Sequence, residues 1–223
     1  MKFLEILKKS PLFSGISEQE TEEILDKINT KTVICKKGEF ILRSGERTEN
    51  IGILLSGSAL VIQEDFWGNR NIMTKLTPGA LFAESFACSP GSRLNVSVAA
   101  ETDSSVMFIS AERIFTLSPV ACPQSSRIIR NLLSDIAGKN LRFNEKIIHM
   151  SKRTTREKLL SFLSAEAQRC GRTEFDIPFS RQQLADYLSV DRSAMSAELS
   201  RLHRDGIVSY RKNHFVLCRE HTL

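Results

Sequence analysis

The sequence predicts an α+β protein: an N-terminal double-stranded β-helix (jelly-roll) domain, a long central helix, and a C-terminal winged helix-turn-helix domain. Three observations support this prediction. Between residues 32 and 109, short apolar runs alternate with glycine-bearing turns, a pattern typical of a β-sandwich or barrel. A proline-free run with apolar residues at helical spacing covers 124–150. Two closely spaced helix caps and a basic hairpin follow. We therefore place the domains at 1–121, 122–150 and 151–223.

One short helix is expected before the β-domain. Ser17 and Glu20 have the spacing of a capping box, in which each side chain satisfies the other residue's free backbone N–H.

Glycine is expected in the turns between strands because several turn types need a positive φ. The strands are expected at 32–34, 40–42, 51–55, 59–62, 72–73, 94–100 and 106–109, with a hairpin tip at Gly68-Asn69.

Residues 124–150 are predicted to form one helix after a break marked by Pro119 and Pro123. Its apolar residues are mostly three, four or seven positions apart, and together they cover a wide surface. One side can pack on the β-domain and another on the same helix of a second chain. Packing wholly within a monomer is the alternative that the pattern leaves open.

The C-terminal part is predicted to fold as a helix-turn-helix. A helix from Thr154 to about Arg169 and a short strand over Phe175–Phe179 come first. Ser180 then caps a helix over Arg181–Leu188, with Gln183 completing a second capping box. After a tight turn, Asp191 caps another helix. The side chains expected to point inward are Leu184, Ala185, Leu188, Val190, Met195, Leu199 and Leu202.

This motif predicts contact with duplex DNA, because the first turns of its second helix enter the major groove. Arg192 can bond guanine edges or a phosphate, serines can donate to either, and Ala197 can touch a thymine methyl. A two-stranded wing over residues 208–217 has a basic tip suited to phosphate. A module that only docks proteins is the alternative. The expected contacts are Ser180, Arg181, Gln182, Asp191, Arg192, Ser193, Ser196, Ala197, Ser200, Arg201, Arg211 and Lys212.

Composition agrees with a DNA-binding protein. The net charge is +5, and residues 149–223 carry +4 of it, which suggests a polyanionic partner. The five cysteines are widely spaced, as expected for free thiols in a reducing cytoplasm rather than for a metal centre. No apolar run is long enough for a membrane helix. No catalytic motif or phosphate loop is present, so we do not expect an enzyme.

The order of these motifs resembles the Crp/Fnr family of bacterial transcription regulators over nearly the whole chain. The matching segments include 12–15, 36–39, 55–57, 78–84 and the terminal helix-turn-helix. The resemblance implies a cytoplasmic homodimer, paired through its long helix on a two-fold symmetric operator and controlled by a ligand or redox signal in the cyclic-nucleotide-binding-like roll. The hairpin at Trp67 resembles a family surface that contacts RNA polymerase, although such a Trp could equally pack against the roll.

The recognition helix and the signal site both depart from the family's pattern. Many members carry Glu and Arg where this chain has Ser193 and Ala197, which predicts a different operator. In members that bind cyclic nucleotides, a Gly-Glu pair precedes an Arg followed by Ser or Thr. Here Ala83 precedes Glu84, and Leu94-Asn95 follows Arg93. These differences argue against cAMP.

Two other signals are also disfavoured. The family's iron–sulfur members hold their cluster on N-terminal cysteines, and this chain has none before Cys35. All four histidines lie at or beyond His149, away from the roll, which argues against haem.

We expect an unidentified small-molecule effector. The pocket residues implied by the resemblance are Phe82, Ala83, Glu84, Ser85, Arg93, Leu94, Asn95, Asn140, Phe143 and Asn144. The alternative is an effector-independent regulator whose roll interior is filled by its own side chains, among them Phe82, Phe86 and Leu94.

Overall fold

The structure is a computed structural model, and it describes residues 3–68, 70–117 and 122–218. These residues form two compact units. The first contains residues 3–68, 73–117 and 122–140, and the second contains residues 70–72 and 141–218. The predicted features at Asn69 and Pro119 lie outside the described residues.

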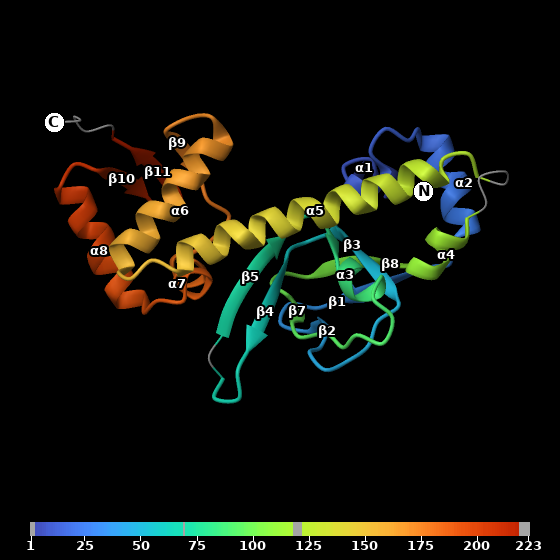
Figure 1. Cartoon of the computed structure of the whole chain (residues 1–223), viewed down its shortest axis with the longest axis horizontal. Coiled ribbons are helices and arrows are strands. Elements are labelled where there is room, and N and C mark those ends of the chain that lie inside the picture. The colour runs from blue at the N-terminus through green and yellow to red at the C-terminus, as the bar shows by residue number, and fades with distance from the viewer. Residues whose placement is uncertain (1–2, 69, 118–121, 219–223) are drawn as a thin grey trace. The chain divides into compact units, whose positions relative to one another are not determined.

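The first unit is built around two four-stranded antiparallel sheets (Figure 1). One sheet has the order β1-β8-β3-β6 and the other has the order β2-β7-β4-β5. This arrangement confirms the predicted β-roll. The strands are β1 (Thr30–Cys35), β2 (Phe40–Leu42), β3 (Asn50–Ser56), β4 (Ala59–Glu64), β5 (Arg70–Leu76), β6 (Leu81–Phe82), β7 (Ser97–Ala100) and β8 (Ser104–Ser110).

Strand β3 is buried on both faces, which explains its continuous apolar run. Leu54 packs with residues of β4, β5, β7 and β8 in the core between the two sheets. Ile51, Ile53 and Leu55 point the other way, into a core shared with the surrounding helices. Successive side chains of a strand point to opposite faces, so one strand serves both cores.

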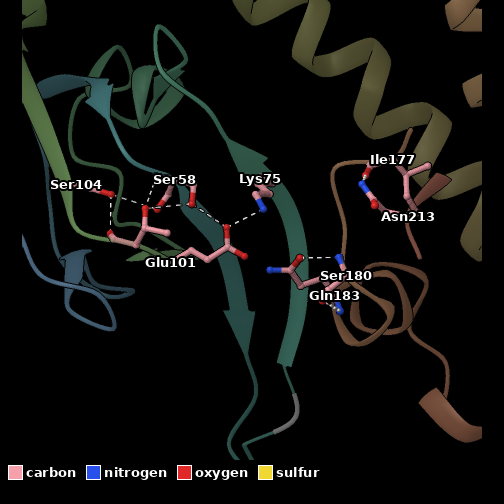
Figure 2. A network of polar contacts seen from close by, with 9 residues as sticks. Ser58, Lys75, Glu101, Ser104, Ile177, Ser180, Gln183 and Asn213 are labelled. Atoms are coloured by element: carbon pink, nitrogen blue, oxygen red, sulfur yellow. Dashed lines mark hydrogen bonds and ion pairs between the residues drawn. The ribbon is translucent and has the colours of Figure 1, made fainter. Parts of the chain in front are cut away.

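The turn between β3 and β4 is held by a polar network that Figure 2 displays. Ser58 Oγ donates to Glu101 Oε2 at 2.8 Å, and Lys75 Nζ pairs with the same oxygen at 2.7 Å. A Cβ added to Gly57 would lie 2.4 Å from Asp103 O and from Ser104 Oγ. Only glycine therefore fits this turn.

Helices cover the outer face of the first sheet. The Ser17–Glu20 capping box that starts α2 is present as predicted. Leu12, Phe13, Ile24 and Ile114 pack from these helices into the core with β3 and β8. The helical segments are α1 (Leu4–Leu7), η1 (Pro11–Phe13), α2 (Glu18–Lys27), α3 (Glu84–Ala87) and α4 (Ala111–Thr116).

The long helix α5 (Ser125–Met150) confirms the helix predicted over 124–150. Ile128 and Leu132 are buried in the helix-covered core of the first unit. Asn131 Nδ2 donates to Leu12 O and Ser14 O, both at 2.9 Å, which ties α5 to the N-terminal segment. Another side of α5 carries large apolar residues that are exposed: Leu133, Leu141, Phe143, Ile147 and Ile148.

The second unit combines three helices with the three-stranded antiparallel sheet β10-β11-β9. Its core includes Phe162, Phe175 and Phe215, and the last two rings stack with centroids 6.4 Å apart. The elements after α5 are α6 (Thr155–Cys170), β9 (Glu174–Asp176), α7 (Arg181–Leu188), α8 (Arg192–Arg204), β10 (Val208–Arg211) and β11 (His214–Leu217).

Two predicted strands are shorter in the structure, and their partners explain why. Residues 94–96 do not join β7, because Leu94 bonds instead to the loop at Gly45 and Glu46. Strand β9 ends at Asp176, since its register with β11 covers three residue pairs and Pro178 has no N–H to continue the ladder. The two-residue strand β6 and the short helices α1, α3 and α4 were not predicted.

Candidate functional site

The two helices of the helix-turn-helix are joined by a three-residue turn. In the capping box of α7, Ser180 N donates to Gln183 Oε1 at 2.8 Å (Figure 2). Ser189 has a φ of 50°, and Val190 N donates to Ala185 O at 3.0 Å. Asp191 Oδ1 then accepts from Ala194 N at 2.8 Å and starts α8. Both predicted caps are confirmed.

The inward face of the motif is the predicted one. Six of the seven expected side chains are buried, and Val190 is half-buried. Ala185 is completely buried, which allows α7 and α8 to cross closely. The buried residues are Leu184, Ala185, Leu188, Met195, Leu199 and Leu202.

The opposite face of α8 is exposed and carries small or basic side chains. Ser193 Oγ donates to Asp191 Oδ1, and this bond lowers the pKa of the Asp191 carboxyl. Ser200 Oγ donates to Ser196 O at 3.0 Å. Both hydroxyls must rotate before they can donate to another molecule. The exposed residues are Arg192, Ser193, Ser196, Ala197, Ser200, Arg201 and Arg204.

The start of α7 is connected to the wing through Arg181. The guanidinium carbon lies 4.7 Å from the centroid of the Tyr210 ring and 4.8 Å from that of Phe215. Burial lowers the pKa of Arg181. Its Nη2 is buried and has no hydrogen-bond partner within the described segments. Ser180 and Gln182 are exposed, and Gln182 Nε2 donates to Asp186 Oδ1 at 2.7 Å.

The wing turns at Lys212-Asn213, where Lys212 has a φ of 54°. Arg211 is the last residue of β10, and Arg211 and Lys212 are both exposed. Asn213 instead turns back, and its Nδ2 donates to Ile177 O at 3.1 Å (Figure 2). The basic tip expected from the sequence is thus present, with both expected wing contacts, Arg211 and Lys212, exposed.

An ion-pair network beside α8 was not predicted. Glu198 accepts from Arg156 of α6 at 3.2 Å and from Arg201 at 3.1 Å. Arg156 also pairs with Asp205 at 3.0 Å. The three-residue spacing of Glu198 and Arg201 was a usable sequence signal. Arg156 lies 42 positions before Glu198, so its part in the network needed the fold.

The interior of the β-roll contains Phe82. Its ring packs edge-on against Phe108, with centroids 6.0 Å apart. A Cβ added to Gly52 would lie 2.2 Å from Phe82 Cζ, so the ring occupies the space that a side chain on β3 would need. Leu94 is also buried, and Phe86 is half-buried.

Glu84 was expected to line an effector pocket, but its carboxylate pairs with the central helix. Lys139 Nζ lies 3.0 Å from Glu84 Oε1 and 2.7 Å from Asp135 Oδ2, and it donates to Leu81 O at 2.9 Å. Ala83, just before α3, has a φ of 61°, in the left-handed region that favours glycine. Glu84 Oε2 is buried and has no hydrogen-bond partner among residues 3–68, 70–117 and 122–218.

The remaining expected pocket residues lie on the surface. Arg93 Nη1 donates to Gly45 O at 2.8 Å, which agrees with a surface-loop arginine. The other exposed members of the expected set are Ser85, Asn95, Asn140, Phe143 and Asn144. Of the ten residues, only Phe82, Ala83, Glu84 and Leu94 are buried or half-buried.

The five cysteines are free thiols, as predicted. Burial raises the pKa of Cys35 and of Cys88, which keeps both protonated. No group of three or more His, Cys, Asp or Glu side chains in the described ranges could hold a metal ion. The helices in those ranges are too short or too polar to cross a bilayer.

Two protein-family models match the chain. The model described as a cyclic nucleotide-binding domain matches residues 32–118. The model described as a Crp-like helix-turn-helix domain matches residues 157–223. They agree with the two units found in the structure, the β-roll and the helix-turn-helix.

Several of the similar proteins over most of the chain are transcription regulators. The chain is 24% identical over 191 residues to the transcriptional activator protein FnrL of Cereibacter sphaeroides, covering 81% of this chain and 73% of FnrL. It is 23% identical over 224 residues to the nitrogen fixation regulation protein FixK of Azorhizobium caulinodans, covering 95% and 85%.

The fold also matches a solved structure. The structure of FixK2 from Bradyrhizobium japonicum aligns with a TM-score of 0.64 and 22% identity, over 86% of this chain and 93% of FixK2. The roll, the helix-turn-helix and these relatives together identify the chain: it belongs to the Crp/Fnr family of transcription regulators and carries a helix-turn-helix DNA-binding domain.

Proposed function

We propose that this regulator binds specific duplex sequences through α8, with α7 and the wing on the flanking phosphates. The observation that carries the proposal is the exposed face of α8, which has Arg192 in its first turn and only small side chains at Ser193, Ser196, Ala197 and Ser200. Small residues let the helix backbone approach base edges closely, and one arginine can bond guanine in two places.

Arg181, Arg211 and Lys212 are proposed to contact phosphate rather than bases. Arg181 Nη2 has no hydrogen-bond partner among the described residues, and it would donate to a phosphate oxygen once the side chain turns from the Tyr210 and Phe215 rings toward the DNA. Phosphate contacts set the position of a protein on DNA, whereas base contacts distinguish sequences. These three residues would therefore contribute affinity on any duplex.

Selection of bound fragments from a random DNA pool tests this function. Specific regulators bind their sites about 10³–10⁷-fold more tightly than unrelated DNA. We expect the selected duplexes to share one sequence motif and to be preferred within that range, as measured by fluorescence anisotropy. Equal affinity for selected and unselected duplexes would contradict the proposal.

We further propose a homodimer paired through α5. Regulators of this family bind DNA and typically act as dimers. The exposed apolar residues of α5 include Leu133, Leu141 and Ile148, which are seven or eight positions apart and so share one side of a helix. Large exposed apolar side chains in one row indicate a surface that another chain covers.

Two hypotheses for control of the roll make different predictions. In the first, an unidentified small molecule binds in the roll and changes operator affinity by about 1–3 kcal/mol. In the second, the roll is filled by its own side chains and needs no effector. The burial of Phe82 between the sheets favours the second.

A screen of purified protein separates the two hypotheses of control. If the roll is filled by its own side chains, the purified protein should bind its operator with full affinity without additives. Nucleotides and other metabolites should not change that affinity. A metabolite that shifts affinity fivefold or more, within the usual range of allosteric coupling, would contradict it.

The hairpin tip between β4 and β5 is proposed to contact RNA polymerase. Phe66 is 95% exposed and Trp67 is 82% exposed, with ring centroids 5.9 Å apart. The alternative that Trp67 packs on the roll is therefore wrong. A Trp67→Ala variant should keep operator affinity and lose transcription activation in a purified system, and unchanged activation would contradict the contact.

A further inference from the structure

Glu198 holds two arginines at once at the edge of the exposed face of α8. Its side chain is 12% exposed, with Oε1 on Arg156 and Oε2 on Arg201. Arg156 also bonds Asp205, two helical turns farther along. Both carboxylate oxygens are thus engaged, one with α6 and the other with an arginine on α8 itself.

Arg201 lies where α8 meets solvent. Its side chain is 62% exposed, and it follows Ala197 by four positions, so the two share one side of the helix. A free arginine at this position would reach whatever phosphate came close. Bonded to Glu198, it occupies one place, and part of its charge is already balanced.

These contacts affect specific and unspecific DNA binding differently. Unspecific affinity comes from neutralised phosphates and released counterions, and it grows with every free cation on the surface. A carboxylate next to Arg201 lowers that contribution on all sequences. On the matching sequence, an arginine already held in place loses less side-chain entropy when it binds.

We infer that Glu198 is a specificity-determining positioning residue, which holds Arg201 for the operator and reduces its attraction to arbitrary DNA. This inference rests on the proposed function of α8. It adds a role for an acidic residue that faces away from the bases. Arg156 is the second support of this arrangement, since it keeps Glu198 directed along α8.

The test compares Glu198→Gln with a matched control. Glu166 of α6 also pairs with an arginine three positions ahead, Arg169, and the two side chains are 13% and 57% exposed. Glu166→Gln therefore removes a carboxylate of similar exposure that also pairs with an arginine but lies away from α8. Affinities for the selected operator and for an unrelated duplex are measured by anisotropy over a range of KCl concentrations, after thermal unfolding confirms that each variant is folded.

Glu198→Gln should bind unrelated DNA about 3–10-fold more tightly, because one freed arginine adds about one phosphate contact and steepens the salt dependence by about 0.9 in log–log slope. Its affinity for the operator should not rise, so the ratio of the two affinities falls. Glu166→Gln should leave both affinities unchanged. The inference would be overturned if Glu198→Gln changed the affinity for both duplexes by the same factor. It would also be overturned if Glu166→Gln changed the two affinities in the same way as Glu198→Gln.

A second variant makes the test independent of Glu198 itself. Arg201→Ala removes an exposed side chain and should weaken operator binding about tenfold, while unrelated DNA loses less than threefold, because Glu198 already offsets its charge. An equal loss on both duplexes would contradict the inference. If the wild type itself fails to distinguish the two duplexes, the proposed function fails, and that result is separate from either variant.

Discussion

Arg192 is the first residue of α8, and its side chain is exposed. If it reads a guanine, Arg192→Ala should weaken operator binding by about 1–3 kcal/mol and relax the preference at one base pair. Anisotropy with the operator and with single-base variants measures both effects. Arg172→Ala serves as the control, because Arg172 is an exposed arginine outside the helix-turn-helix. An equal loss of affinity on all sequences would show that Arg192 contacts phosphate and not a base.

The Glu84–Lys139 pair is the second residue-scale test. Lys139→Ala leaves Glu84 buried without its cation, and breaking a buried ion pair in this way typically costs about 3–5 kcal/mol. Urea unfolding measures the loss. Lys8→Ala is the control, because its pair with Glu18 is half exposed and should be worth less than about 1 kcal/mol. Similar losses of unfolding free energy in both variants would show that the buried pair stabilises the fold no more than the exposed pair.

At the scale of elements, α5 carries the prediction about dimers. Leu141→Glu places a charge on the exposed apolar row and should shift the protein toward monomer, because a charge in an apolar interface loses its hydration. Light scattering after gel filtration measures the change in mass. Phe115→Glu makes the same replacement at an exposed apolar residue of α4. A dimer that persists in Leu141→Glu, or that is lost equally in Phe115→Glu, would contradict pairing through this row.

The junction of α5 and α6 should respond to pH through His149. Its Nδ1 lies 2.8 Å from Ser161 Oγ, and its ring packs edge-on against Phe162. Burial lowers the pKa of His149, with Glu145 opposing and Lys152 adding to the shift. The folded state therefore favours the neutral ring, while the unfolded chain takes up a proton near pH 6.5.

The stability that His149 contributes is present above about pH 6.5 and is lost as the pH falls through the lowered value. Thermal unfolding between pH 7.5 and 5.5 measures this dependence. His149→Gln can still bond Ser161 without titrating, so its melting temperature should fall less over that range. An identical pH dependence in wild type and variant would exclude the imidazole as the cause.

At the scale of the whole molecule, the features that the sequence predicted are those that depend on residues close together in the chain. The capping boxes at Ser17 and Ser180 and the turn before Asp191 are short-range patterns, and all three are present. The inward face of the helix-turn-helix follows from helical periodicity in the same way. These features determine the fold class and the face of α8 that is proposed to bind DNA.

The sequence could not predict contacts between segments that are far apart in the chain. Glu84 and Lys139 are 55 positions apart, and only the fold brings Lys139 to the start of α3. Phe82 appears in the sequence as one more apolar residue, and its place across from Gly52 depends on the pairing of β6 with β3. The expected effector residues likewise come from distant segments, and six of the ten are exposed in the single chain, so their meeting in one pocket stays a prediction.

The most direct test of the central claim is the mass of the complex with a selected operator, measured by light scattering alongside a nuclease footprint. Two chains are expected on each operator duplex. Their footprint should be two-fold symmetric, with half-sites one helical turn, about 34–36 Å, apart. A single chain per duplex with an asymmetric footprint, or no protected region at all, would contradict it.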